Sequence, residues 1–323
     1  YYTLRIAIPE KLNKTHIALI ACTILISPYF RTNAYWPSSE NLQIFFVILS
    51  LFFYFFLINR NNIDKFELYC LSILSIFSAY CAFYTDQKAF FLVAFIYFDL
   101  IRRNNLIFFL IFSFLNLLLF LPTIYLFISW GGLVPIESQT RVSLYYEGTN
   151  TFISTIGIYF TLIFISNFLK NNFWKKINLK RIDIFLICIL AIYLFFSLPS
   201  SPITFGSGII SKFMGLISVK LNLDWFLIKY TYFILNLLFT GIILLLVKKN
   251  FKNIFIFLSF LIVYNLTTIT YQSYVDPIFY ILIFTILDFK KNIIIYSKKT
   301  SYLFVCFYTL MLSGSILVRN YII

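Results

Sequence analysis

Residues 106–130 read LIFFLIFSFLNLLLFLPTIYLFISW, a run of 25 positions without a charged side chain. A transmembrane α-helix needs about 20 mostly apolar residues to cross the hydrocarbon core of a bilayer. A run of this length is therefore typical of a membrane span. Similar apolar runs recur from one end of the chain to the other. They are continuous, whereas the strands of a membrane β-barrel would alternate apolar and polar residues.

The composition points the same way. Of the 323 residues, 61% are hydrophobic and only 12% are charged, whereas soluble proteins average about 25% charged residues. So few charges cannot cover a water-facing surface, so the surrounding solvent must be lipid. The sequence predicts an all-α, polytopic integral membrane protein, with residues 1–323 forming one domain. About eleven helices are expected, at residues 15–30, 41–58, 67–83, 88–100, 106–130, 151–169, 182–199, 225–247, 254–270, 274–288 and 301–318.

The cationic residues predict the orientation of these helices. Lys and Arg concentrate in cytoplasmic loops of membrane proteins. Of the 26 Lys and Arg residues, 19 fall in one set of alternate loops and seven in the other. The richer set includes residues 1–14 and is predicted to be cytoplasmic. The net charge of +14 is therefore mainly a topology signal. Membrane lipids are expected partners, and nucleic acid is not.

Polar side chains gather instead in the loops of the opposite, non-cytoplasmic side. These loops hold the carboxylates of Glu40, Asp86, Glu137, Glu147, Asp224 and Asp276. Carboxylates, cations and aromatic rings at a membrane surface suit a sugar–phosphate ligand, because cations bind phosphate and carboxylates accept sugar hydroxyls. An interfacial aromatic belt with ordinary loops is the alternative. Residues 199–225 are predicted to form a non-cytoplasmic loop or an interfacial amphipathic helix.

Three carboxylates have a local structural interpretation as well as a functional one. Glu40 opens a helix, where a carboxylate interacts favourably with the helix dipole. Asp86 and Lys88 form either a charged turn between two helices or an acid–base pair beside a lipid phosphate. Asp276 precedes Pro277, and proline is favoured in the first turn of a helix. The five cysteines lie in apolar runs without the spacing of a metal site. No cofactor is predicted, and a divalent metal ion remains open.

These motifs resemble the GT-C class of membrane glycosyltransferases, which take sugars from a polyprenyl-phosphate carrier. The segment PYFRTNAYWPSSENLQIFFVILSLFFYFF (28–56) resembles the family's aromatic loop with an acidic residue before a long helix. The turn SAYCAFYTDQKAFFLVAF (78–95), the helix end FISWGGLVP (127–135) and YQSYVDPIFYIL (271–282) are similar to motifs of the dolichyl-phosphate-glucose-dependent α-1,2-glucosyltransferases. This chain has Asp86-Gln87 where that group has Arg-Gln, and Trp130 where Asn is usual.

The resemblance implies a sugar transfer at the non-cytoplasmic surface, with a polyprenyl-phosphate sugar as donor and a lipid-linked glycan as acceptor. The candidate catalytic carboxylates are Glu40, Glu137 and Asp276. Candidate substrate-binding residues are Arg141, Lys88, Gln87, Tyr274 and Trp130. The family's usual catalytic carboxylate lies in the first non-cytoplasmic loop. Because this chain begins at Tyr1 as if within a helix, we expect that loop to lie upstream. A multi-pass position in a bacterial inner membrane, with the site on the periplasmic or external face, is expected.

Two other functions compete with this one. A polysaccharide polymerase or lipid-linked-sugar flippase would have a similar composition. Such polymerases tend to have a large non-cytoplasmic loop with several arginines, whereas residues 131–150 contain a single arginine, Arg141. A structural or respiratory membrane subunit from an AT-rich genome is the third possibility, since Phe, Ile, Asn, Lys and Tyr dominate the sequence.

Overall fold

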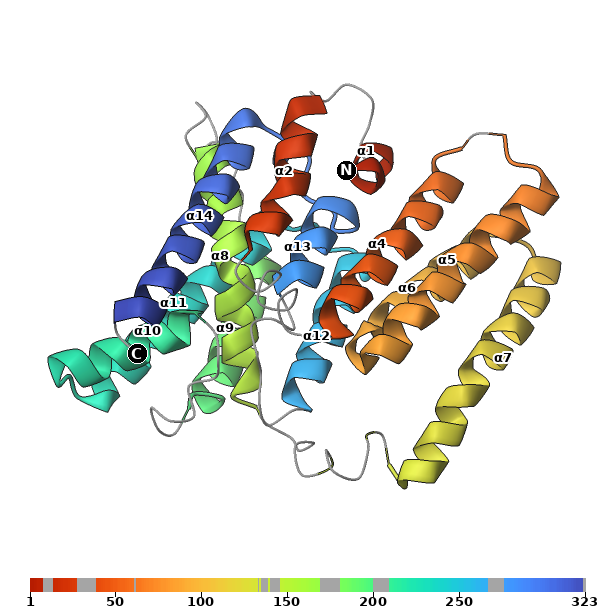
Figure 1. Cartoon of the computed structure of the whole chain (residues 1–323). Coiled ribbons are helices and arrows are strands. Elements are labelled where there is room, and N and C mark those ends of the chain that lie inside the picture. The colour runs from red at the N-terminus through yellow and green to blue at the C-terminus, as the bar shows by residue number, and fades with distance from the viewer. Residues whose placement is uncertain are drawn as a thin grey trace. The chain divides into compact units, whose positions relative to one another are not determined.

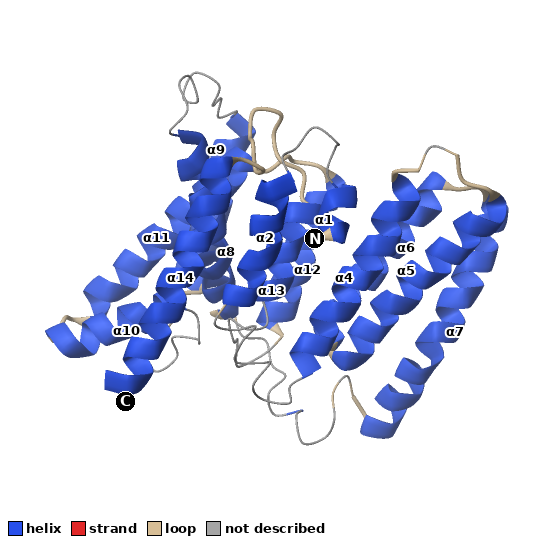
Figure 2. Ribbon diagram, turned by 45° about the horizontal axis from the view of Figure 1, so that its top comes forward, coloured by secondary structure: helices blue, strands red, loops and turns tan. Residues whose placement is uncertain are grey.

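The computed structural model of the chain describes residues 1–7, 14–27, 39–60, 62–132, 134, 139, 146–168, 181–199, 209–266 and 276–321. Helices fill most of this part of the chain (Figure 1). Figure 2 shows the helices and the loops that join them. Among the described residues, the one β-type pairing is an isolated bridge between Val247 and Phe289.

Each of the eleven predicted ranges contains a helix. These helices are α2 (Lys14–Ile26), α4 (Ser39–Ile58), α5 (Lys65–Thr85), α6 (Phe90–Arg103), α7 (Leu106–Trp130), α8 (Gly148–Phe168), α9 (Arg181–Phe196), α11 (Trp225–Leu246), α12 (Phe251–Asn265), α13 (Asp276–Thr285) and α14 (Lys298–Tyr321). Further short elements are α1 (Tyr2–Ala7), the 3-10 turn η1 (Gln87–Ala89) and α10 (Ile209–Leu221). The last of these lies inside the segment 199–225, for which the sequence predicted a loop or an interfacial helix.

Five helices in the described part are long and apolar enough to cross a membrane: α4, α5, α7, α8 and α11. The helix α7 matches its predicted range and exposes large apolar side chains, among them Phe114 and Ile128. Such a surface is costly in water and is expected where a helix contacts lipid. The described chain is an all-helical protein with apolar helices of membrane-spanning length.

The chain divides into two compact units. Unit 1 comprises residues 1–11 and 33–143, and unit 2 comprises residues 12–32 and 144–323. In unit 1, α4 and α5 pack closely, and the hydroxyl of Ser50 donates to the carbonyl of Ser75 at 2.8 Å while Ser75 donates to Ser50 at 3.1 Å. Small residues that satisfy their own hydroxyls let two helix backbones approach inside an apolar bundle.

Most cations of the described part of unit 1 lie at one set of helix ends. Arg60, Lys65 and Arg103 lie at the end where α4 finishes and α5 begins. Glu40 and Asp86 lie at the opposite end, where α4 begins and α5 finishes. We call this second end the outer end of unit 1, because the loop charges predict that it faces away from the cytoplasm. The separation agrees with the predicted alternation of the loops within this unit.

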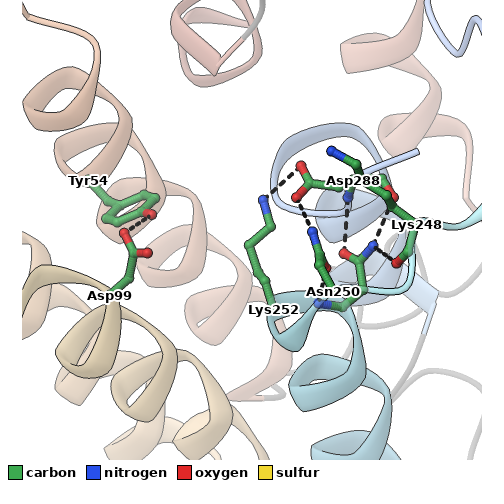
Figure 3. Close-up of polar contacts among 7 residues, drawn as sticks. Tyr54, Asp99, Lys248, Asn250, Lys252 and Asp288 are labelled. Atoms are coloured by element: carbon green, nitrogen blue, oxygen red, sulfur yellow. Dashed lines mark hydrogen bonds and ion pairs between the residues drawn. The ribbon is translucent and has the colours of Figure 1, made fainter. Parts of the chain in front are cut away.

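A partly buried polar contact joins α4 to α6 near the basic end of unit 1. The hydroxyl of Tyr54 donates to Asp99 Oδ2 at 2.7 Å (Figure 3). Arg103 Nε donates to the same oxygen at 2.5 Å. Tyr54 is 3% exposed. A carboxylate near a membrane core is costly unless it is paired. The two donors satisfy Asp99 Oδ2, and the bond from Tyr54 links α4 to α6.

Unit 2 is built around α8, which is more enclosed than the other four membrane-length helices. Its neighbours include α11, α12 and α14. Gly157 allows a close approach of α8 and α11, because a Cβ at this position would lie 2.3 Å from Cγ of Phe239 on α11. The hydroxyl of Tyr308 on α14 also donates to that of Tyr159 at 3.1 Å.

The last turn of α8 lies beside the start of α14. Thr300 donates to Ser166 Oγ at 2.9 Å, and the Asn167 amide exchanges hydrogen bonds of 3.1 and 3.0 Å with the backbone of Ile294. Burial raises the pKa of Tyr296 in the adjoining loop above its usual range, so this hydroxyl stays neutral and donates to the carbonyl of Phe284. We call the opposite end of α8, where the helix begins, the outer end of unit 2.

Candidate functional site

The first turn of α4 places Glu40 at the outer end of unit 1. Its carboxylate lies at the start of a 20-residue helix, where the dipole favours a negative charge. Three residues later on the same helix face, Gln43 is 2% exposed, and its Nε2 donates to the carbonyl of Asp86 at 3.2 Å. This bond holds the start of α4 against the turn between α5 and α6. Glu40 therefore lies within about one helical turn of that contact.

The turn at residues 86–88 carries an ion pair. The backbone of Asp86 is extended and ends α5, and its Oδ1 accepts from the backbone N–H of Lys88 at 3.0 Å. Its Oδ2 lies 3.0 Å from Lys88 Nζ, with side chains that are 16% and 23% exposed. The pair is thus largely shielded and rigid. Gln87, between the two, is half-buried.

These contacts bring three of the predicted site residues together at one end of one unit: Glu40, Gln87 and Lys88. The charge of Lys88 is balanced by Asp86 in this arrangement. A phosphate that binds here would share the ammonium group with the carboxylate or replace it. Asp86 therefore holds the ammonium group of Lys88 in its position.

Trp130 ends α7 at the outer end of unit 1. Gly131 follows in the left-handed conformation with φ of 64°, which closes the helix, and Gly132 N–H donates to Phe127 at 3.1 Å. Gln139 Nε2 donates to the carbonyl of Trp130 at 2.9 Å, so Gln139 lies beside the end of α7. Trp130 lies seven residues, or roughly 10 Å, beyond Thr123, whose hydroxyl is 3.4 Å from that of Tyr84 on α5.

The other four predicted site residues lie wholly or partly outside the described part of the structure. Glu137, Arg141 and Tyr274 lie outside the described residues. Asp276 begins α13 as the sequence predicted, but its side chain is outside the described part of the structure. Their roles stay predictions. Among the described residues, no group of three or more His, Cys, Asp or Glu side chains is arranged to hold a metal ion.

A second polar cluster lies at the outer end of unit 2 and was not predicted. It comprises Thr149, Asn150, Tyr193, Ser197, Asn236 and Asn265, which we call the outer polar cluster. Asn150 is 1% exposed, and its Nδ2 donates to the carbonyl and the hydroxyl of Ser197 at 2.7 and 2.8 Å. Thr149 donates to Asn265 Oδ1 at 2.8 Å, and Asn265 Nδ2 donates to the hydroxyl of Tyr193 at 3.0 Å.

One atom of this cluster lacks a partner in the described part of the chain. Asn236 is fully buried, and its Nδ2 donates to Asn150 Oδ1 at 3.1 Å. Its Oδ1 accepts no hydrogen bond from the described residues. Leaving a buried acceptor unsatisfied costs about 1–3 kcal/mol. A donor supplied by water or by a polyhydroxyl ligand would remove that cost. Amides and hydroxyls in this arrangement are suited to hydroxyl-rich ligands.

The sequence contained a weak signal for this cluster. The stretch GTNTFIST (148–155) is rich in small polar residues, and six of its members have exposed fractions of 5% or less: Thr149, Asn150, Thr151, Phe152, Ser154 and Thr155. Polar residues inside a membrane helix usually face other helices. The predicted helix 151–169 begins inside this stretch, which leaves residues 148–150 in the preceding loop.

Comparison of the chain with known protein families, with characterised proteins and with solved structures gave no match. The fold and composition define the class as an all-helical protein with membrane-length apolar helices. Within this class, the two outer polar regions are the candidate sites.

Proposed function

We propose that this chain is a membrane glycosyltransferase that moves a sugar from a polyprenyl-phosphate carrier to a lipid-linked acceptor. The eleven-span topology, the non-cytoplasmic position of the site and the likeness to the GT-C class belong to the same proposal. The observation that carries it is the approach of the Glu40 helix start to the Asp86–Lys88 pair through the bond from Gln43. This places a carboxylate and a cation at one helix-bundle end.

These two groups match the needs of the reaction. A carboxylate base removes the proton of an acceptor hydroxyl, whose oxygen then forms a bond to the anomeric carbon of the sugar. The bond from that carbon to the phosphate oxygen breaks, and polyprenyl phosphate leaves with the electron pair. The leaving group is anionic, so it needs cationic stabilisation rather than a proton. Glu40 is the proposed base, Lys88 the proposed cation, and Gln87 and Trp130 the proposed contacts to sugar or carrier.

The test is transfer by the purified full chain in lipid. The chain is incubated with radiolabelled polyprenyl-phosphate sugars and a lipid-linked glycan acceptor, and labelled product is counted. Loss of a general base typically costs 10²–10⁴ in rate, so Glu40→Gln should reduce transfer at least about a hundredfold. Glu67→Gln is the matched control, because Glu67 lies at the basic end of unit 1 in an exposed pair with Arg60. No transfer by the wild-type chain, or equal activity of E40Q and E67Q, would overturn the proposal.

The outer polar cluster favours one second candidate, a polysaccharide polymerase. A polymerase must hold a growing glycan with many hydroxyls, and the cluster offers amide and hydroxyl groups that suit such a ligand. The same assay separates the two candidates when an oligosaccharide linked to polyprenyl diphosphate is offered as a second substrate. A polymerase would consume an oligosaccharide linked to polyprenyl diphosphate and give a ladder of products. A transferase of the first kind would add one sugar from the monophosphate carrier.

A further inference from the structure

A small two-segment bridge forms at the end of unit 2 away from its outer polar cluster. Val247, directly after α11, pairs with Phe289, which follows α13. Lys248 N–H donates to the carbonyl of Asp288 at 2.9 Å, and Lys290 N–H donates to that of Leu246 at 3.0 Å. Both segments belong to the loops that the sequence predicts to be cytoplasmic.

The bridge separates apolar from charged side chains. In extended segments, successive side chains point to opposite faces. Val247 is 6% exposed, and the ring of Phe289 lies 6.0 Å from that of Phe160 on α8, so these two residues face the bundle. Lys248, Asp288 and Lys290 therefore point to the other face. Nζ of Lys290 donates to the carbonyl of Leu244 at 2.9 Å, at the end of α11.

The carboxylate of Asp288 is fully engaged. Its Oδ2 accepts from Asn250 Nδ2 at 2.6 Å, and its Oδ1 lies 2.9 Å from Lys252 Nζ (Figure 3). Asn253, which is 1% exposed, accepts from the backbone N–H of Asp288 at 3.0 Å and donates to its carbonyl and to that of Lys248 at 2.8 Å. These contacts fix the turn before α12 to the bridge.

The result is a rigid surface with excess positive charge. Residues 247–252 and 286–291 contain five lysines and one aspartate. Lys248, Lys249 and Lys291 are exposed, and we call these three the lysine platform. Beside it, Phe251 is 70% exposed and Ile254 is 51% exposed on α12. A cationic surface next to exposed apolar side chains fits the boundary between phospholipid headgroups and acyl chains.

We propose that the lysine platform binds anionic phospholipid headgroups of the adjoining leaflet. The apolar neighbours Phe251 and Ile254 favour a lipid over a soluble phosphate, because they would lie among the acyl chains. The platform is independent of the proposed transfer reaction and involves none of its residues. A basic residue at an anionic surface contributes about fivefold in binding, so three of them give a loss on the order of 100-fold when removed.

The test measures phospholipid binding to the detergent-purified full chain by native mass spectrometry and by thermal unfolding. Phosphatidylglycerol should bind and raise the unfolding temperature, whereas phosphatidylcholine should not. The K248Q/K249Q/K291Q variant should lose this effect, and the corresponding triple Lys→Arg variant should keep it. The matched control is K220Q/K229Q, which removes lysines of the predicted outer set. Circular dichroism checks that each variant is folded.

Three results would overturn the proposal. The first is equal stabilisation by phosphatidylcholine and phosphatidylglycerol. The second is equal stabilisation by inorganic phosphate, which would identify a soluble anion as the ligand. The third is a loss of phosphatidylglycerol binding in K220Q/K229Q as large as that in the platform variant, which would show that net charge alone attracts the lipid.

Discussion

Gly157 gives the sharpest test of the packing in unit 2. In a Gly157→Ala variant the new Cβ would lie 2.3 Å from Cγ, 2.5 Å from Cβ and 2.6 Å from Cδ2 of Phe239. Carbon atoms pack at about 3.5–4.0 Å, so α8 and α11 must separate by about 1 Å. Rotation of the Phe239 ring cannot relieve the clash, because the Cβ of Phe239 is itself too close.

The magnitude follows from two opposing effects. Overpacking of a filled core costs about 1–3 kcal/mol, occasionally more. A clash with both the backbone-attached carbon and the ring of Phe239 belongs at the upper end of this range. Replacing glycine by alanine inside a helix returns about 1 kcal/mol through helix propensity. Gly157→Ala should therefore lower the free energy of unfolding by about 2 kcal/mol.

The assay is thermal unfolding of the purified chain in detergent. Gly241→Ala is the matched control, because Gly241 lies in α11 and an added Cβ would have no heavy atom within 4 Å. This variant gains helix propensity without a clash, so its unfolding temperature should stay unchanged or rise. If Gly157→Ala proved as stable as Gly241→Ala, the close approach of α8 and α11 would be wrong.

Three further variants test the polar contacts. Asn150→Ala removes the partner of Asn236 and the bonds to Ser197, so the free energy of unfolding should fall by about 2–4 kcal/mol. The control Asn116→Ala loses only a bond to Phe112 of its own helix and should cost less. Equal unfolding temperatures for the two variants would contradict the hydrogen bonds of the outer polar cluster. Asn253→Ala should destabilise by about 2–3 kcal/mol and expose the turn before α12 to protease. An unchanged cleavage rate would show that the Asn253 hydrogen bonds are not needed to hold this turn. Asp99→Asn should lower the free energy of unfolding by about 1–3 kcal/mol, because Arg103 loses its ionic partner. Glu67→Gln, in the exposed pair with Arg60, should change little. Equal melting curves for the two variants would show that the two ion pairs do not differ in stabilisation.

The helices could be predicted from the sequence because a helix in lipid needs a continuous apolar run. The range 106–130 coincides with α7, since Asn105 caps its start and Gly131 closes its end. The prediction for α12 began at residue 254, whereas the helix begins at Phe251 because Asn250 Oδ1 accepts from Asn253 N–H at 2.9 Å. The predicted range 15–30 contains a shorter helix that ends at Ile26, two residues before Pro28 in the sequence.

The candidate sites were harder to predict, because they depend on contacts between distant residues. The helix-start position of Glu40 could be predicted from local sequence, and that position is confirmed. The bond from Gln43 to Asp86 spans 43 residues and has no local signal. The pairing of Asp86 with Lys88 was one of two interpretations of a charged turn. The outer polar cluster was missed because nothing in GTNTFIST shows which neighbouring helices will cover it.

That cluster has a consequence for how the protein is made. Thr149 and Asn150 leave the ribosome well before the residues that satisfy them, since the bond from Thr149 to Asn265 spans 116 positions. Until α11 and α12 have been synthesised, the amides and hydroxyls in the first turn of α8 would face lipid without hydrogen-bond partners. We therefore expect α8 to be held at the insertion machinery, or its start to stay in the aqueous compartment, until its later partners have been made.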